Sequence, residues 1–400
     1  MTAKWICCQI GAREHYVIPR ALSKRMSLQC LITDVWARPN SLLAGLKHDL
    51  RERFHPELAE AKVCASNVSA LAFEARARLG GVRGWRLMRQ RNKWFQQRAL
   101  VEIVRHSALK GSGDVTLFAY SYAAGRLLQF AHRQGWRTVL GQIDAGPLHE
   151  RIVAELNEAY LAWRGDRRPA PPEYWDDWRN ECALAERIVV NSTWSRDALI
   201  QEGVAATKIS IVPVAFEKPL ETKSFERRYP AAFTPDRPMR VLFLGQINLA
   251  KGVGQLLEAA KLLRDEPAEF WFVGPVHIAV PAELKRIPQM QWIGPVPRRE
   301  VAKYYREADV FVFPTLSDGF GLTQLEAQSW KLPVVASRFC GDVVRDGVNG
   351  VILKEVSGAT ITAVLFDFLR NPGKLHAMAA GSGIEDKFSL DSLATSLLSL

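Results

Sequence analysis

The stretch VFVFPTLSDGFGLTQLEAQSWKLPVVAS, residues 310–337, decides the fold class of this chain. It opens with four apolar residues, turns at Gly-Phe-Gly, continues as a helix-like segment and closes with a second apolar run after Pro333. Continuous apolar runs without alternation are typical of strands buried on both faces of a parallel sheet. The stretch therefore predicts a strand, a helix that starts near Leu322, and a second strand of an α/β unit.

Apolar runs alternate with helix-like segments through both halves of the chain. In the second half the strand candidates are 239–245, 268–274, 290–294, 309–314, 333–337 and 350–353. In the first half they are 5–10, 28–34, 115–121, 137–143, 187–192 and 209–214. Segments 252–266 and 298–308 have helical periodicity. The pattern predicts two doubly wound α/β domains of the Rossmann type.

A segment rich in proline and charge, residues 216–238, separates the two halves and has the composition of an interdomain linker. We therefore predict an N-terminal domain at 1–215 and a C-terminal domain at 239–400. A chain of 400 residues is long enough for two hydrophobic cores. Ligands usually bind in the cleft between two such domains.

Composition indicates an ordinary globular protein and excludes a disordered or fibrous one. With 48% hydrophobic and 24% charged residues the chain is typical of globular proteins, and its net charge of +11 favours anionic partners. The six cysteines form no C-x-x-C pair, so we expect reduced, buried thiols and no zinc site. The N-terminus resembles a first strand more than a signal peptide, and no segment approaches the roughly 18 apolar residues of a membrane span. These features favour a cytoplasmic location.

Two acidic residues flank the glycine turn of the opening stretch. Asp318 precedes the turn and Glu326 lies about one turn into the expected helix, whose free N–H groups suit a diphosphate. Glu326 could accept hydrogen bonds from a ribose, and Asp318 could reach the hydroxyls of a sugar. Lys251, at the end of LFLGQINLAKG (242–252), is placed to bind phosphate. The alternative is that all three are ordinary solvated side chains.

Several stretches, taken in their order along the chain, resemble a known family, the retaining glycosyltransferases of family 4. They are RIVVNSTWSRDALIQEGVAATKISIVPV (187–214), LFLGQINLAKG, residues 310–337 and GDVVRDGVNGVIL (341–353). The resemblance covers most of the chain and is strongest from residue 187 onward. It implies the GT-B fold, in which two Rossmann-like domains face each other across a cleft, and transfer of a sugar from a nucleotide-sugar donor with retention of configuration.

The resemblance also implies roles for individual residues. Lys251 would contact the donor diphosphate, Glu326 would hold the ribose and Asp318 would bind the transferred sugar. Val296, in the turn WIGPV (292–296), is the candidate for reading the base. The other positions implied in donor binding are Gly245, Gln246, Gly319 and Phe320, with the backbone amides of Gly321, Leu322 and Thr323 at the phosphates.

The chain departs from the family pattern on both sides of the cleft. Gln246 stands where many members have an arginine beside the diphosphate, and Asp318 replaces a glutamate more common there. In the N-terminal domain many members present a histidine after the fourth strand, where this chain has Asp144. We take Asp144 as a catalytic candidate with Lys251, Asp318 and Glu326; a turn or helix-capping role is the alternative.

The acceptor side of the cleft would include His149, five residues after Asp144. It would also include Gly11, which follows the first strand and matches the family's glycine loop. The alternative is that Gly11 only forms a simple turn between a strand and a helix.

A positive group and a helix N-terminus can stabilise a leaving diphosphate without a metal. The sequence also lacks an Asp-x-Asp pair on a loop after a strand. We therefore expect no required metal and no cofactor besides the donor. The acceptor is expected to be a glycan, a lipid-linked molecule or another compound, with cell-envelope polysaccharide or glycoconjugate synthesis as the family's usual setting. A non-catalytic protein that binds a nucleotide-sugar or a glycan is the alternative.

Residues 76–110 form the most basic segment, with ten Lys or Arg residues against Glu102 and with Trp85, Trp94 and Phe95 interleaved. The segment predicts contact with an anionic membrane at the inner face or with an anionic acceptor. The alternative is a solvated basic helix whose aromatic residues pack inward. Nucleic acid is disfavoured because no recognised binding motif accompanies the charge.

Overall fold

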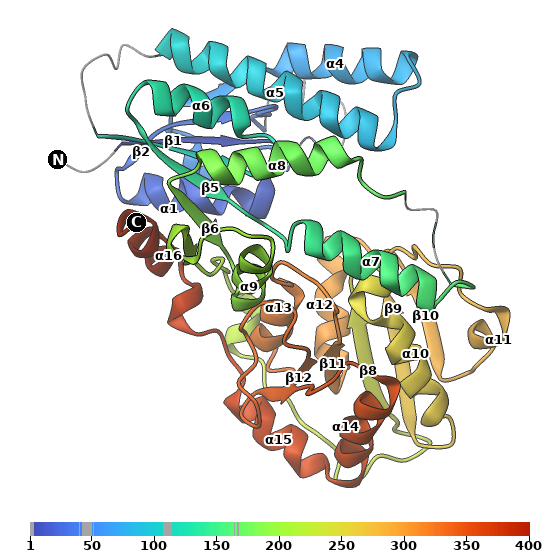
Figure 1. The fold of residues 1–400 in the computed structure, drawn as a ribbon. Helices are drawn as coiled ribbons and strands as arrows, with labels where there is room; N and C mark the ends of the chain where they lie inside the picture. The colour runs from blue at the N-terminus through green and yellow to red at the C-terminus, as the bar shows by residue number, and fades with distance from the viewer. Residues whose placement is uncertain are drawn as a thin grey trace.

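The computed structural model describes residues 4–39, 41, 50, 52–106, 114–163, 165 and 168–400. Within these residues the chain forms two parallel sheets, one after the other in sequence, each covered by helices on both faces (Figure 1). The two sheets confirm the predicted α/β class with two Rossmann-like domains.

The first sheet has seven parallel strands in the described residues, in the order β3-β2-β1-β4-β5-β6-β7. The strands are β1 Lys4–Gln9, β2 Leu28–Thr33, β3 Val63–Ala65, β4 Val115–Tyr120, β5 Arg137–Gly141, β6 Arg187–Val190 and β7 Ile209–Ile211. The helices are α1 Val17–Lys24, α4 Asn67–Leu79, α5 Gly84–His106, α6 Gly125–Arg133, α7 Pro147–Ala159, α8 Pro172–Leu184 and α9 Thr193–Gln201. The strand order reverses between β1 and β4, so this sheet is doubly wound.

The second sheet has six parallel strands in the same described part, in the order β10-β9-β8-β11-β12-β13. The strands are β8 Met239–Leu244, β9 Ala268–Val273, β10 Met290–Gly294, β11 Val310–Phe313, β12 Val334–Ala336 and β13 Gly350–Ile352. The helices are α10 Val253–Leu262, α11 Ala282–Lys285, α12 Arg298–Glu307, α13 Thr323–Ser329, α14 Gly358–Arg370, α15 Pro372–Gly381 and α16 Leu390–Leu398. Here the order reverses between β8 and β11.

Each predicted apolar run forms a strand, and the helix expected near Leu322 begins at Thr323. The four residues of β11 are all buried because helices cover both sides of the sheet, which explains the absence of alternation in its sequence. Strand β3 was not predicted. It is three residues long and lies at the edge of the first sheet, so its apolar signal is short.

The chain crosses between the domains twice. The linker after β7 carries it to β8, and the segment before α16 carries it back, so that α16 packs on α1 through Leu393 and Leu397. The two crossings are joined where the N–H of Phe216 donates to the carbonyl of Phe388 over 2.8 Å. We predicted a C-terminal domain that extends over residues 239–400. The last helix, α16, instead lies on the N-terminal domain, because its apolar face completes the core of that domain.

Helix α7 also connects the two domains. It begins at Pro147, shortly after β5, and extends over the second domain (Figure 1). Near its end Leu156 and Tyr160 pack against the core of that domain, and the hydroxyl of Tyr160 donates to Glu258 Oε1 over 2.9 Å. The helix therefore ties the end of β5 to the second domain.

The cysteines are free and buried. Among the described residues, none of the helices combines the length and the apolar character needed to cross a membrane.

Candidate functional site

Most of the predicted donor residues lie beyond the carboxyl ends of β8 and β11, the two strands at which the order of the second sheet reverses. Ligands of doubly wound sheets bind at such a position. The loop after β11 faces the first domain closely: a Cβ placed on Gly319 would lie 1.7 Å from the carbonyl oxygen of Ile143, beyond the end of β5. The site therefore lies where the two domains meet.

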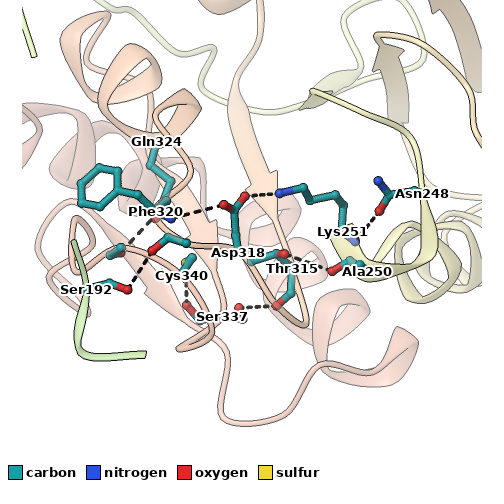
Figure 2. Close-up of polar contacts among 12 residues, drawn as sticks. Ser192, Asn248, Ala250, Lys251, Thr315, Asp318, Phe320, Gln324, Ser337 and Cys340 are labelled. Carbon is teal, nitrogen blue, oxygen red and sulfur yellow. Dashed lines mark hydrogen bonds and ion pairs between the residues drawn. The ribbon is translucent and has the colours of Figure 1, made fainter. Parts of the chain in front are cut away.

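Lys251 is held by the loop that follows β8. The side chain of Asn248 accepts a hydrogen bond from the Lys251 backbone N–H over 3.0 Å, which caps the short 3-10 turn η5 (Leu249–Lys251). Gly252 then adopts φ +70°, and a Cβ there would meet the carbonyl of Pro314 at 1.9 Å. This close approach brings the β8 loop against the β11 loop, where Lys251 Nζ forms an ion pair with Asp318 (Figure 2).

Asp318 is fixed by its own turn. Its Oδ1 accepts the backbone N–H of Phe320 over 3.2 Å, and its N–H donates to the carbonyl of Phe339 over 2.9 Å. The side chains of Lys251 and Asp318 keep 21% and 18% of their surface exposed, so both remain accessible to a ligand. The turn depends on Gly321, which has φ +78° and lies against the Phe313 ring.

Glu326 lies in the first turn of α13 and is oriented by a residue from a different helix. The hydroxyl of Tyr305, in α12, donates to Glu326 Oε2 over 2.7 Å. Tyr305 is fully buried, and burial followed by the nearby Glu326 charge raises the pKa of its phenol well above the ordinary value. The phenol therefore stays a donor, which fixes one carboxylate oxygen of Glu326 and leaves the other for a ligand.

The remaining donor-side predictions are spread along the same edge of the sheet. Gly245 directly follows β8, and the exposed Gln246 lines a cavity of about 460 Å³ between the domains, which Asn157 of α7 also lines. Val296 is half-buried in the loop after β10. Leu322 caps α13 and Thr323 opens it, so their backbone N–H groups belong to the free first turn of that helix.

Asp144 lies beyond the end of β5, and its Cα would be 3.3 Å from a Cβ placed on Gly319. Its Oδ1 accepts three hydrogen bonds: from the Tyr122 hydroxyl over 2.6 Å, from Gln142 Nε2 over 2.8 Å and from the Gly146 N–H over 2.9 Å. Asp144 therefore has the turn role that the sequence left open, and Oδ2 takes part in none of these bonds. His149 lies half-buried in the first turn of α7.

Gly11 follows β1 with φ +79°, and its N–H donates to Asp34 Oδ1 over 2.8 Å. Three successive residues after it also have positive φ, namely Glu14, His15 and Tyr16. Such backbone conformations are costly outside glycine and persist only where surrounding contacts hold them. One of these contacts crosses the domains, since His15 Nε2 lies 2.6 Å from Arg298 Nη1 in α12.

Several residues of the site were not predicted. The hydroxyl of Ser192, the N-cap of α9, donates to the carbonyl of Gly319 over 2.8 Å, and Ser195 Oγ approaches the same oxygen at 3.3 Å. These buried hydroxyls connect the first domain to the turn that holds Asp318, and Figure 2 shows Ser192 beside that turn. The signal was present as the Asn-Ser turn at 191–192. Tyr122 and Tyr305 gave no signal, because their partners lie in distant segments.

Comparison with known proteins adds an independent line of evidence. Residues 238–371 match the family model of glycosyl transferases group 1. The chain is 29% identical over 230 residues to a D-inositol 3-phosphate glycosyltransferase of Paenarthrobacter aurescens, covering 54% of this chain and 56% of the relative. The chain thus spans just over half the length of this curated relative.

Two solved structures share the fold over nearly the whole chain. HepE of Anabaena, solved in complex with UDP, has a TM-score of 0.61 at 14% identity and covers 98% of each chain. Sucrose-phosphate synthase of Thermosynechococcus elongatus has a TM-score of 0.61 at 16% identity, covering 99% of this chain and 97% of that one. At such identities the likeness concerns the fold alone.

Proposed function

From the group 1 glycosyltransferase domain at residues 238–371 and the GT-B fold of the chain, we propose that this protein is a retaining glycosyltransferase. It moves a sugar from a nucleotide-sugar to a glycan, lipid-linked or other acceptor, without a required metal. Cell-envelope polysaccharide or glycoconjugate synthesis is the proposed setting, and a cytoplasmic location goes with a nucleotide-sugar donor.

The observation that carries the proposal is the convergence of Lys251, Asp318 and Glu326 at the carboxyl ends of β8 and β11. A nucleotide-sugar presents a ribose, a diphosphate and a sugar in sequence. Glu326 offers a carboxylate oxygen to the ribose, Lys251 offers a positive charge to the diphosphate, and Asp318 offers an acceptor to the sugar hydroxyls. The three side chains thus supply one matched group for each part of the donor.

The chemical task of such a reaction is to stabilise negative charge on the departing diphosphate while the sugar becomes electron-poor. Lys251 Nζ lies over the Phe313 ring, 5.6 Å from the ring centroid, and its ion pair with Asp318 fixes its position. A preorganised cation stabilises the leaving group without reorganisation. Asp144 faces this region from the first domain, where its carboxylate would contribute to the charge around the reacting carbon.

Residues 84–106 of the basic segment form α5, and residues 107–110 lie outside the described residues. Phe95 is buried and Trp94 stacks on Phe73 at 5.4 Å, so these two aromatic residues pack inward. At the turn between α4 and α5, Leu79 is 89% exposed beside several arginines. Contact of this turn with an anionic membrane remains a proposal, testable by sedimentation with phosphatidylglycerol vesicles.

The donor site is tested by calorimetric titration with UDP-, GDP- and ADP-sugars in the presence of EDTA. We expect one nucleotide to bind, and Lys251→Ala and Glu326→Ala each to weaken binding about tenfold or more, the loss typical of a charged hydrogen-bond partner. Lys261→Ala and Glu307→Ala, at exposed positions of α10 and α12, are matched controls that should bind as the wild type does.

Loss of binding on adding EDTA would overturn metal independence. If no nucleotide binds, or if the site variants equal the controls, the donor site is wrong. Binding without transfer or hydrolysis of the donor would favour the alternative, a non-catalytic protein that binds nucleotide-sugars or glycans.

A further inference from the structure

Two adjoining hollows lie in the first domain, away from the donor residues. One, of about 280 Å³, is formed by α5, α6 and α8, and the other, of about 520 Å³, by α5 and the segment before α8. Arg89 and Lys93 of α5 line both, so the two lie side by side. Their size is that of a small-molecule site, which is typically about 300–1,000 Å³.

The hollows are strongly basic. Their charged lining consists of five cations and two acids: Arg86, Arg89, Lys93, Arg126 and Arg168 against Asp177 and Glu181. Arg89 already contacts Glu173 at 3.4 Å. Lys93 and Arg126 are exposed and form no ion pair within the part of the chain that the structure describes. Two cations on facing helices, α5 and α6, therefore remain available to one anionic group.

The acids of the lining are occupied. Both carboxylate oxygens of Glu181, which is 2% exposed, accept backbone hydrogen bonds at the start of α6: Oε2 from Tyr122 over 2.6 Å and Oε1 from Ala124 over 2.7 Å. Asp177 approaches Arg89 at 3.9 Å. An anion in the hollows would thus meet side-chain cations. The backbone N–H groups at the start of α6 would not bind it, because they are already bonded to Glu181.

A row of aromatic rings runs from these hollows to the cleft. Trp85 lies 4.9 Å from Tyr174, which stacks on Tyr122 at the same centroid distance. The Tyr122 hydroxyl donates to Asp144, which lies against Gly319 of the donor loop. Aromatic faces beside cations are suited to a sugar ring that carries a negative charge, because the ring's C–H face packs on the aromatic surface and the charge meets the cations.

We propose that the hollows form a subsite for an acidic saccharide, whose carboxylate or phosphate is bound by Lys93 and Arg126 and whose ring packs on the partly exposed Trp85. This assignment rests on the proposed function, since the saccharide would be the part of the acceptor held beyond the cleft. The row of tyrosines places the subsite on the Asp144 side, opposite the donor residues.

The test is ligand-observed NMR and calorimetry on the full chain with glucuronic acid, glucose 6-phosphate, neutral glucose and inorganic phosphate. We expect both acidic sugars to bind more tightly than glucose and phosphate. Lys93→Ala combined with Arg126→Ala should weaken that binding about tenfold or more, because it removes two charged hydrogen-bond donors. Arg133→Ala is the matched control, because Arg133 is an exposed arginine at the other end of α6 and should leave binding unchanged.

Nucleotide binding separates this inference from the proposed function. The double variant should bind UDP, or whichever nucleotide the donor titration identifies, as the wild type does. If acidic sugars bind no better than glucose, or the double variant equals Arg133→Ala, the subsite is wrong whatever the nucleotide result. Equal binding of inorganic phosphate, or binding of phosphatidylglycerol vesicles through Lys93 and Arg126 without binding of acidic sugars, would also overturn it. Binding of acidic sugars without any nucleotide would support the subsite and overturn the donor site.

Discussion

The ammonium of Lys251 and the carboxylate of Asp318, 67 residues apart in sequence, form an ion pair between the loops that follow β8 and β11. In this arrangement the proposed diphosphate-binding charge is neutralised by the proposed sugar-binding acid. An incoming diphosphate must therefore share Lys251 with a neighbouring negative charge, while the sugar that accompanies it gains a hydrogen-bond acceptor.

Replacing Asp318 with asparagine should separate these two effects. We expect UDP, or the nucleotide that the donor titration identifies, to bind about twofold to fivefold more tightly to Asp318→Asn, since a partly exposed pair contributes about 0.2–1 kcal/mol. Sugar transfer should fall by about a hundredfold as the charged acceptor is lost. Calorimetry and turnover measure the two, with the exposed Asp265→Asn as control. Equal nucleotide affinity in both variants would show that the pair does not compete with the diphosphate.

Gly319 is confined by the opposite domain. A Cβ there would meet the Ile143 carbonyl at 1.7 Å, so Gly319→Ala must push the domains apart. We expect a loss of about 1–3 kcal/mol in the free energy of unfolding, typical of overpacking, and a larger fall in transfer activity. Gly373→Ala is the control, because a Cβ there meets nothing within 4 Å. Urea unfolding and a transfer assay would contradict this prediction if the two variants behaved alike.

Asp144→Asn distinguishes a catalytic role from a turn role. The amide oxygen can still accept hydrogen bonds from the Tyr122 hydroxyl and the Gly146 N–H, so the melting temperature should change by no more than a few degrees. If the negative charge acts on the reacting sugar, kcat should fall about tenfold or more with nucleotide affinity unchanged. An unaltered kcat would leave Asp144 with the turn role alone.

Glu181 gives a prediction about pH. Burial raises its pKa from 4.5 to about 7, despite the backbone N–H groups that favour its charged form. Because the folded pKa lies above the unfolded value, the folded state binds more protons between these limits, and this contribution to stability is lost as pH rises from about 4.5 to 7. Between pH 5 and pH 8 the free energy of unfolding, measured with urea, should fall by about 2 kcal/mol more in the wild type than in Glu181→Gln.

A matched variant controls the pH experiment. Glu173, near the start of α8, has 63% of its side chain exposed, so Glu173→Gln should keep the pH dependence of the wild type. If Glu181→Gln also kept it, the buried carboxylate would not be the group that titrates.

The fold was predictable because its strands are buried on both faces. The run of β11, for example, has no polar residue to obscure it, and Pro314 directly after it marks where the strand ends. The edge strand β3 and the return of α16 to the first domain were not predictable. The first is too short for a periodicity, and the second depends on an apolar face whose partner, α1, lies at the other end of the chain.

For the candidate site, the sequence indicated the groups that we propose contact a ligand, but not the residues that hold those groups in place. Glu326 stood out beside a glycine turn, whereas Tyr305 is an ordinary helical residue until α12 packs beside α13. In the same way Glu181 reaches the N–H of Tyr122 across 59 residues. Contacts between residues so far apart in sequence form only when the elements pack together, so they cannot be predicted from the local sequence.

The double crossing of the chain limits how the two halves can move. Both crossings meet where the N–H of Phe216 is bonded to the carbonyl of Phe388, so the two connections between the halves are joined to each other at one place. Sliding one domain along the other would strain this bond and both crossing segments together. The docking of α7 on Glu258 is a third tie between the domains, remote in sequence from both crossings.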